Sequence, residues 1–471
     1  MKEGKQMKEN KMGTLPINKL IITMSLPVMI SMVIQSLYNI VDSIFVAQLG
    51  ENALTAVSLA FPVQNLMLAL QVGTGVGINA LLSRKLGENK YKDANKAALN
   101  GLFLAVVHYL LFLAAAFLLV EPFFKAQTSD PEILKAGMTY LRIVMVFSFG
   151  QFIQVTAERL LQATGRTVDS MWIQGTGAVI NIILDPIMIF GLLGFPRMGV
   201  AGAAYATVIG QTIAGVIGIW LNVKRNKELN LSLKGFKPEK GIIRSIYMVG
   251  IPSTVMTSIT SVTTFALNMI LIQFSTTATA VFGVYYKLQS FVFMPIFGIN
   301  NGIIPIISYN YGAKKKQRIT ESIRLSIIYA TGIMFAGLLI FQLFPEQLLS
   351  LFNASEDMIA IGVPSIRIIS WCFVLAGFNI IATTIYQAFG KGMISLFSSI
   401  IRQLVVLIPL AYVLSLTGNI NAVWWSYPLA ELAAAIFCGY FLHSLYKRVI
   451  NVLPDEPGKE IDLTQPVTVK K

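Results

Sequence analysis

The sequence is short of the residues that most catalytic and metal sites use. Its 471 residues include two cysteines and two histidines. Cys372 and Cys438 both lie in apolar runs, which argues against a disulfide framework and a thiolate metal site. His108 and His443 are isolated from each other, and no G-x-x-x-x-G-K-[ST] motif for a nucleotide occurs. We therefore expect no enzyme activity and no cofactor.

Charged residues are also scarce, at 13% of the chain, whereas 55% of the residues are hydrophobic and the mean hydropathy is +0.67. This composition is too apolar for a soluble domain of this length and indicates a polytopic protein of the lipid bilayer. A net charge of +14 would suggest nucleic-acid binding in a soluble protein. Here the positive charges lie in the loops between apolar runs, so no nucleic-acid partner is expected.

Twelve apolar runs predict an all-α fold, because each is long enough to cross a bilayer as a helix. They fall near residues 17–48, 53–83, 95–120, 132–155, 160–190, 199–223, 242–273, 278–309, 319–345, 358–386, 393–416 and 420–446. The first run is too long for a signal-peptide core and lacks an A-x-A cleavage pattern, so we interpret it as a retained transmembrane helix.

The loops after the second, sixth and eighth runs are rich in Lys and Arg, and the opposite loops hold little beyond Lys125 and Arg197. The positive-inside rule then places the chain in the cytoplasmic membrane with both termini in the cytoplasm. The longest internal polar segment divides six runs from six. The expected organisation is an N-terminal tail (1–16), a first lobe (17–223), a linker (224–241), a second lobe (242–446) and a C-terminal tail (447–471).

An ungapped shift of 225 residues relates the two halves of the chain. It pairs Pro27 with Pro252, Gln64 with Gln289, Gly73 with Gly298, Gly77 with Gly302, Gly87 with Gly312, Arg142 with Arg367 and Gln162 with Gln387. Coincidences at such residue types indicate a duplication, hence two pseudo-symmetric lobes. Because each half has an even number of spans, the repeats are parallel, as in transporters that expose a site alternately to each face.

The acids occur in one half only. The shift carries Asp42 to Leu267, Asn181 to Val406 and Asp185 to Leu410. Gln35, Tyr38, Asn39 and Asp42 stand at i, i+3, i+4 and i+7 and share one helical face. An aspartate within a span costs roughly 2.5–3.5 kcal/mol, so this face points into the protein.

Asn181 and Asp185 lie one helical turn apart, beside Pro186. If they converge with Asp42, the pair of acids can either ionise around Na⁺ or retain a proton. The alternative is a structural pair that only positions helices. Pro27 is either a hinge or a static kink, Lys287 either lines a cavity or extends to the interface, and Arg402 and Glu431 are expected to form a structural bridge.

The chain resembles the multidrug and toxic compound extrusion (MATE) family, and most closely its bacterial MepA-like branch. The resemblance extends from about Leu15 to Arg448 and rests on YNIVDSIFVAQLG, NIILDPIMIFG, GVAGAAYAT and FVFMPIFGINNGIIPIISYNYGA. It implies a MATE fold of two six-helix lobes that rock around a cleft. It also implies a monomer that exports cationic, amphipathic drugs and dyes in exchange for H⁺ or Na⁺.

By the same resemblance Asp42, Asn181, Asp185 and Thr207 couple the ion, and Pro27 is the hinge. The substrate-binding residues are expected to be Gln35, Tyr38, Asn39, Asp42, Gln64, Asn268 and Gln289. Na⁺ coupling in the second lobe is not expected, since no acid occurs in CFVLAGFNIIATTIY. A lipid-linked saccharide flippase of the same superfamily is the alternative, although a strongly cationic cleft is missing from the sequence. Two lobes do not suit the ring-like filter of a channel.

Overall fold

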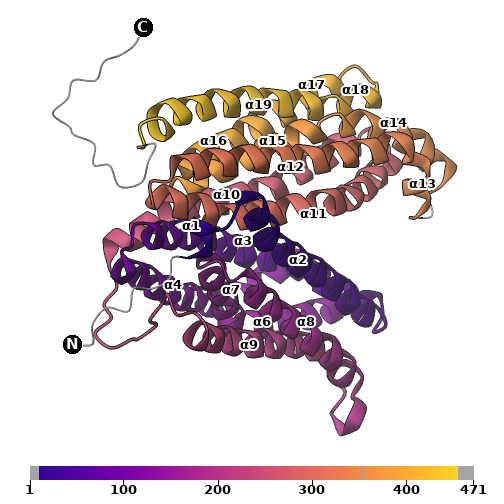
Figure 1. Ribbon diagram of the computed structural model, residues 1–471. Helices are drawn as coiled ribbons and strands as arrows, with labels where there is room; N and C mark the ends of the chain where they lie inside the picture. Colours follow the sequence, from indigo (N-terminus) through magenta and orange to yellow (C-terminus); the bar gives the residue numbers. More distant parts are fainter. Residues whose placement is uncertain (1–9, 353, 455–471) are drawn as a thin grey trace.

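The computed structural model describes residues 10–352 and 354–454, and these are helical with short connections and no strands. Two lobes lie side by side (Figure 1). The first contains α2 (Ile17–Ala47), α3 (Glu51–Gly87), α4 (Tyr91–Leu118), α5 (Val120–Lys125), α6 (Pro131–Val146), α7 (Phe149–Ala163), α8 (Thr167–Phe190) and α9 (Val200–Lys224). The second contains α10 (Lys240–Leu271), α11 (Thr276–Gly312), α12 (Lys316–Leu343), α13 (Pro345–Ser350), α14 (Glu356–Ser370), α15 (Phe373–Ala388), α16 (Gly392–Ile400), a π-helix (Ile401–Leu407), α17 (Ile408–Ser415), α18 (Ile420–Trp424), α19 (Ser426–Leu445) and a second π-helix (Tyr446–Ile450).

Ten helical segments of the described chain are long and apolar enough to cross a membrane, and two bent pairs complete twelve spans. The pairs are α6 with α7 and α14 with α15, and each is bent by 49°. The predicted spans 132–155 and 160–190 are therefore wrong at their shared boundary. The fourth span continues through its bend to Ala163, and the fifth begins at Thr167. Glu158 and Arg159, which fall between the two predicted spans, therefore lie within the fourth span and not at the membrane surface.

The two lobes meet at helix crossings that need glycine in both copies of the repeat. A Cβ on Gly87 of α3 would lie 1.9 Å from the carbonyl oxygen of Tyr309. A Cβ on Gly312 of α11 would lie 2.2 Å from the carbonyl oxygen of Arg84. These contacts are related by the same shift of 225 residues, so the crossing of α3 and α11 has twofold pseudo-symmetry. Small residues allow such close helix packing in membranes.

The same glycine-mediated packing joins the lobes further along these helices. On α3, Gly73 faces Thr254 of α10, where a Cβ would come within 2.6 Å of its backbone nitrogen. On α11, Gly298 faces Met29 of α2, where a Cβ would lie 3.1 Å from its Cα. The duplicated glycines of the sequence thus mark places of closest approach between the lobes.

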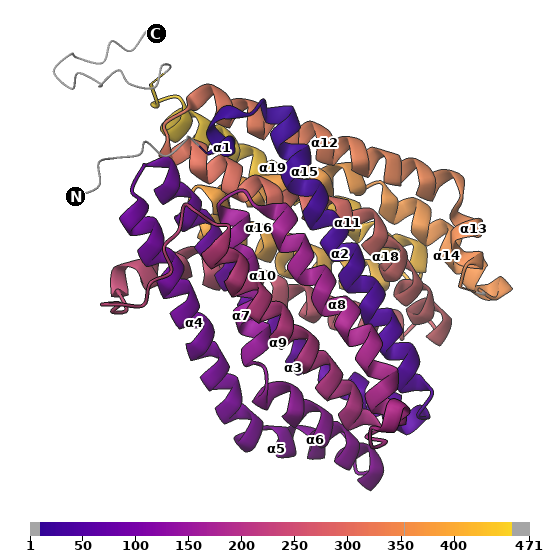
Figure 2. The same cartoon turned by 60° about the horizontal axis from the view of Figure 1, so that its bottom comes forward.

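A short N-terminal segment connects the lobes at one end of the bundle, here called the α1 end after α1 (Lys11–Thr14). Figure 2 shows α1 at this end and α5 and α13 at the other. Asn10 Nδ2 donates to the carbonyl of Thr164 in the first lobe at 3.0 Å. Arg318 of α12 donates to the carbonyls of Met12 and Leu15 at 3.0 and 2.7 Å. The segment therefore bridges both lobes.

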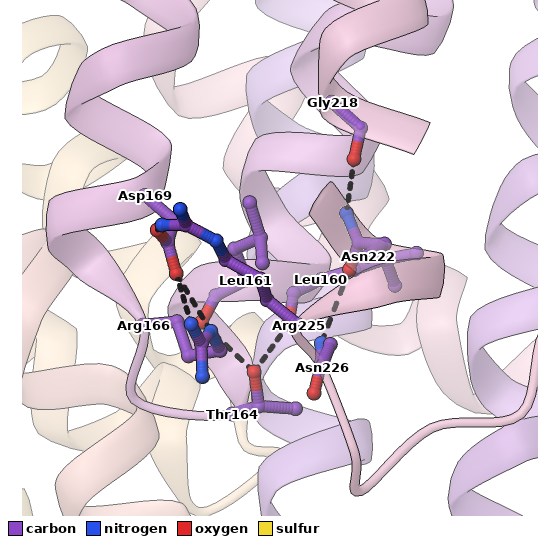
Figure 3. Close-up of polar contacts among 9 residues, drawn as sticks. All are labelled: Leu160, Leu161, Thr164, Arg166, Asp169, Gly218, Asn222, Arg225 and Asn226. Atoms are coloured by element: carbon purple, nitrogen blue, oxygen red, sulfur yellow. Dashed lines mark hydrogen bonds and ion pairs between the residues drawn. The ribbon is translucent and has the colours of Figure 1, made fainter. Parts of the chain in front are cut away.

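The connection between the lobes begins at the same end and is attached to the first lobe. Asp169 of α8 forms ion pairs with Arg166 and Arg225 (Figure 3). The N–O distances are 2.6 and 3.1 Å. Further on, Asn95 Oδ1 accepts from the Asn230 backbone at 2.7 Å. Asn230, Phe236 and Glu239 of this connection thus contact α4.

Candidate functional site

Three helices of the first lobe bring its polar residues together. A close crossing sets α8 against α9, since a Cβ on Gly210 would lie 2.8 Å from the carbonyl oxygen of Gly177. About one helical turn from this crossing lie Asn181 on α8 and Thr207 on α9. Asn181 Nδ2 donates to Thr207 Oγ1 at 3.2 Å and to Asp185 Oδ1 at 3.3 Å. Helix α2 packs on α8 from the other side and carries Asp42, which interacts electrostatically with Asp185. We call Asp42, Asn181, Asp185 and Thr207 the acid cluster.

Several oxygen atoms of the acid cluster are buried without a partner. Among the described residues, Asp42 Oδ1, Asn181 Oδ1 and Asp185 Oδ2 accept no hydrogen bond. Asp185 is fully buried and Asn181 is 2% exposed. A buried, unpaired acceptor costs about 1–3 kcal/mol, and more when it is charged. Carboxylate and amide oxygens are acceptors or hard cation ligands, so the cluster suits a proton or a cation such as Na⁺.

Tyrosines and an amide surround the acids. Tyr38 and Tyr140 both lie close enough to Asp42 and Asp185 to interact with them electrostatically. Gln64 Nε2 donates to the Tyr140 hydroxyl at 3.3 Å. Tyr140, on α6, was not predicted from the sequence because nothing distinguishes it from other aromatic residues in apolar runs. The structure therefore places Tyr38 and Gln64 around the acids.

A separate cavity of about 560 Å³ lies between the lobes and is called the central cavity. Among the predicted substrate-binding residues, Gln35 and Gln289 line it. Asn39 is exposed and Asn268 is half-buried, and neither lines this cavity. The first helix therefore serves two regions, because α2 contributes Gln35 to the cavity and Asp42 to the acid cluster.

The central cavity contains charges that the sequence did not place there. On α7, Glu158 and Arg159 line it, although their place between the predicted spans 132–155 and 160–190 suggested an interfacial location. Arg159 Nη1 donates to Asn301 Oδ1 of α11 at 2.7 Å, and this bond crosses between the lobes. In the second lobe, Arg402 and Glu431 also line it. The four charged side chains of its wall are two acids and two bases.

Two smaller expectations are resolved by the structure. The predicted pair of Arg402 and Glu431 is confirmed, with 2.9 Å between Nη1 and Oε1. Lys287 lies 5.9 Å from the ring centroid of Phe352 and does not line the central cavity. Pro27 is buried inside the continuous helix α2, and its carbonyl accepts from Ser31 Oγ at 2.9 Å. Its action as a hinge stays a prediction.

Two segments of the chain, residues 27–187 and 252–413, match a family model described as MatE. They begin 225 residues apart (252 − 27), the same distance as the internal repeat. The chain belongs to the MatE family. The model matches each half of the chain once, in agreement with the helix boundaries and glycine contacts that the two lobes share.

Relatives of this MatE-family chain cover nearly all of it. It is 26% identical to the multidrug export protein MepA of Staphylococcus haemolyticus (strain JCSC1435), over 92% of this chain and 95% of that protein. It is 25% identical to an FAD transporter of Shewanella oneidensis, over 92% and 96%. Among solved structures, an outward-facing multidrug resistance MATE family transporter of the MOP superfamily superposes with a TM-score of 0.87. That structure is 27% identical, over 94% of this chain and 100% of the other.

Proposed function

We propose that this protein is a secondary active multidrug exporter that moves cationic, amphipathic drugs and dyes out of the cell in exchange for inward H⁺ or Na⁺. The observation that carries the proposal is the acid cluster, in which two carboxylates and an amide present unpartnered buried oxygens. An unpaired buried charge is strongly destabilising, so binding of a cation or a proton stabilises such a cluster. The multidrug export function named for the staphylococcal relative supports the drug substrates.

In this proposal, helix α2 couples ion binding at the acid cluster to drug binding in the central cavity. Asp42 and Gln35 are seven residues apart, which is about 10 Å along a helix. An ion at the acid cluster therefore changes the position of the helix that also forms the cavity wall. Antiport needs roughly 1–3 kcal/mol of coupling between the two sites. Pro27 is the proposed hinge that allows α2 to bend between the two states.

The membrane arrangement follows the charge distribution and the lobe contacts. The tails (1–16 and 447–471) and linker (224–241) face the cytoplasm, and the lobes (17–223 and 242–446) span the cytoplasmic membrane. Residues 1–9 and 455–471 lie outside the described part of the chain. The glycine crossings near Gly87 and Gly312 then close the cytoplasmic side. The protein acts as a monomer, because its two lobes already enclose the cavity.

The test is efflux of ethidium from energised cells that express wild type or Asp42→Asn at equal membrane levels, with H⁺ and Na⁺ gradients collapsed separately. We expect the variant to lose efflux and the wild type to lose it when one gradient is removed. The matched control is Ser43→Ala, next to Asp42 on α2, which should retain export because Ser43 is exposed and its hydroxyl donates to the Asn39 carbonyl of its own helix. Equal loss at both positions, or unchanged efflux in Asp42→Asn, would contradict the proposal.

The alternative of a lipid-linked saccharide flippase receives less support. A pyrophosphate group calls for a concentration of positive charge. The central cavity balances two bases with two acids, and Arg159 is already engaged by Gln162 and Asn301. An enzymatic function is likewise not proposed, since the family and the paired lobes are those of membrane transporters.

A further inference from the structure

The second lobe contains a charged pair that the acid cluster and the ion cycle do not use. Arg402 lies on the π-helix Ile401–Leu407, and Glu431 lies on α19. Single turns of π-helix cost hydrogen-bond geometry and occur frequently at functional sites. Both side chains reach the central cavity, and Asp42 and Asp185 are not part of its lining. The pair is therefore a feature of the substrate space and is separate from the proposed ion site.

Glu431 and Arg402 differ in how many of their hydrogen-bonding atoms have a partner. Both carboxylate oxygens of Glu431 are used, since Oε1 accepts from Arg402 at 2.9 Å and Oε2 accepts from Asn379 Nδ2 at 2.6 Å. A guanidinium has five N–H donors. Among the described residues, Arg402 uses only Nη1, and its side chain remains 25% exposed. The remaining donors have no hydrogen-bond partner in the described part of the chain, so they are available to a solute in the cavity.

The second-lobe wall of the central cavity, to which Arg402 belongs, suits a flat solute. The cavity wall of the second lobe includes the aromatic rings of Phe282, Tyr286, Phe293 and Tyr427. The other polar groups there are neutral, such as Gln403, whose Oε1 accepts from Thr263 at 3.3 Å. A guanidinium binds a carboxylate or phosphate with two parallel hydrogen bonds, whereas aromatic walls bind ring systems.

We propose that Arg402 binds the carboxylate or phosphate group of an aromatic solute, and so selects anionic aromatic compounds among those that enter the central cavity. The proposal rests on the proposed function only in requiring that the central cavity holds the transported compound. Glu431 orients the guanidinium through one arm and leaves the others for the ligand. The same carboxylate weakens the attraction for anions, so removing it should strengthen binding.

The test is a binding titration of the purified full-length protein with riboflavin 5′-phosphate, followed by flavin fluorescence. Neutral riboflavin has the same ring system and serves as the matched ligand, and ethidium is the cationic one. Hydrogen bonds to charged groups contribute about 1.5–3 kcal/mol. We therefore expect Arg402→Gln to weaken the binding of riboflavin 5′-phosphate about tenfold or more, to change riboflavin binding less than about twofold, and not to weaken ethidium binding, because Glu431 is left without its cation.

Glu431→Gln should act in the opposite direction and tighten the binding of riboflavin 5′-phosphate by several-fold. Lys287→Gln, which removes a cation outside the cavity, is the control and should have no effect. If either single variant fails to fold, the double variant Arg402→Gln/Glu431→Gln leaves no unpaired charge and should still lose the preference for phosphate over riboflavin.

Two results would overturn the proposal. One is unchanged binding of riboflavin 5′-phosphate in Arg402→Gln or in the double variant. The other is equal loss of all three ligands in both single variants, which is the behaviour of a purely structural bridge. The titration uses no ion gradient, so its outcome is independent of the efflux experiment with Asp42→Asn.

Discussion

At the scale of single residues, the acid cluster depends on one amide and one hydroxyl. Asn181 Nδ2 is shared between Asp185 and Thr207, and Oδ1 of the amide accepts from no donor among residues 10–352 and 354–454. Thr207 therefore fixes which way the amide faces. The uncharged Thr207 hydroxyl thus has a positional role in the proposed ion site, because it holds the Asn181 oxygen where a cation can be bound.

Replacing this hydroxyl should impair coupling without disturbing the fold. In Thr207→Val the shape is kept but the acceptor for Asn181 is lost, so we expect several-fold slower ion-driven efflux and a higher ion concentration for half-maximal rate. Thr212→Val is the control on the same helix, since Thr212 Oγ1 bonds only its own helix at Val208 O. Equal effects of the two variants in an ethidium efflux assay would assign the loss to α9 packing.

A second residue-scale prediction concerns stability at the α1 end. Burial raises the pKa of Glu228 above its ordinary value of 4.5, despite the lowering effect of Asn10, Arg166 and Lys11. The folded protein then holds this proton more strongly than the unfolded chain does. Protonation of Glu228 therefore stabilises the folded protein. This contribution is fully present below about pH 4.5 and is lost as the pH rises through the raised pKa of the folded state.

We therefore expect Glu228→Gln to raise the unfolding temperature of the purified protein at neutral pH and to flatten its decline as pH rises above 4.5. The measurement is thermal unfolding in detergent across a pH series. The exposed Glu321→Gln is the control and should keep the wild-type slope. A Glu228→Gln variant that is less stable than wild type at neutral pH would show that the ionised carboxylate is favourable there.

At the scale of helices, the duplicated glycines explain how the lobes approach each other. In the sequence they are only repeated residues, but in the structure each removes a Cβ from a backbone contact with the other lobe. The bends of α6–α7 and α14–α15 are duplicated in the same way, at 49° each. The helix crossings and bends are therefore the same in both lobes, whereas the acids Asp42 and Asp185 occur only in the first.

An added methyl group at such a crossing should separate the lobes there. In Gly312→Ala the Cβ would meet the backbone of Arg84, which cannot rotate away, so we expect about 1–3 kcal/mol of destabilisation and a lower unfolding temperature. Gly332→Ala in α12 is the matched control, since no described atom of another helix lies within 4 Å of its Cβ position. That change should be neutral or stabilising by up to about 1 kcal/mol. Equal unfolding temperatures for the two variants would contradict the interpretation of the crossing.

At the scale of the whole molecule, each lobe is a complete set of six spans, and the lobes contact each other through α2, α3, α10 and α11. The connection between them runs along the first lobe and passes Gly235 in an open turn with a φ of +74°. The interface, more than the covalent connection, should therefore hold the lobes together.

A chain divided after Lys234 should consequently still work when both pieces are produced in one cell. Each piece has an even number of spans and inserts with both ends on one side of the membrane. We expect ethidium efflux to return to a substantial fraction of the wild-type rate, and either piece alone to give none. Failure of two stably inserted pieces to restore efflux would show that the connection is needed for coupling.

Composition and repetition determined much of this protein before any tertiary information. The hydropathy predicted the spans, and the 225-residue shift predicted two related lobes, because backbone groups in a bilayer must be satisfied within helices. The one-sided distribution of Asp42, Asn181 and Asp185 also selected the lobe with the acid cluster. Span ends were less predictable near Glu158 and Arg159, since hydropathy cannot distinguish a polar residue in a cavity from one at the membrane surface.

Only the tertiary structure decided which polar residues share a space. It placed Gln35 and Asp42, from one helical face, in two different regions, and it brought Tyr140 to the acids from a distant span. It also showed that Arg402 and Glu431 belong to the cavity wall. Sequence periodicity reports one helix at a time, whereas a cavity is formed where several helices bend and cross. The side chains that meet there are therefore determined by packing between helices.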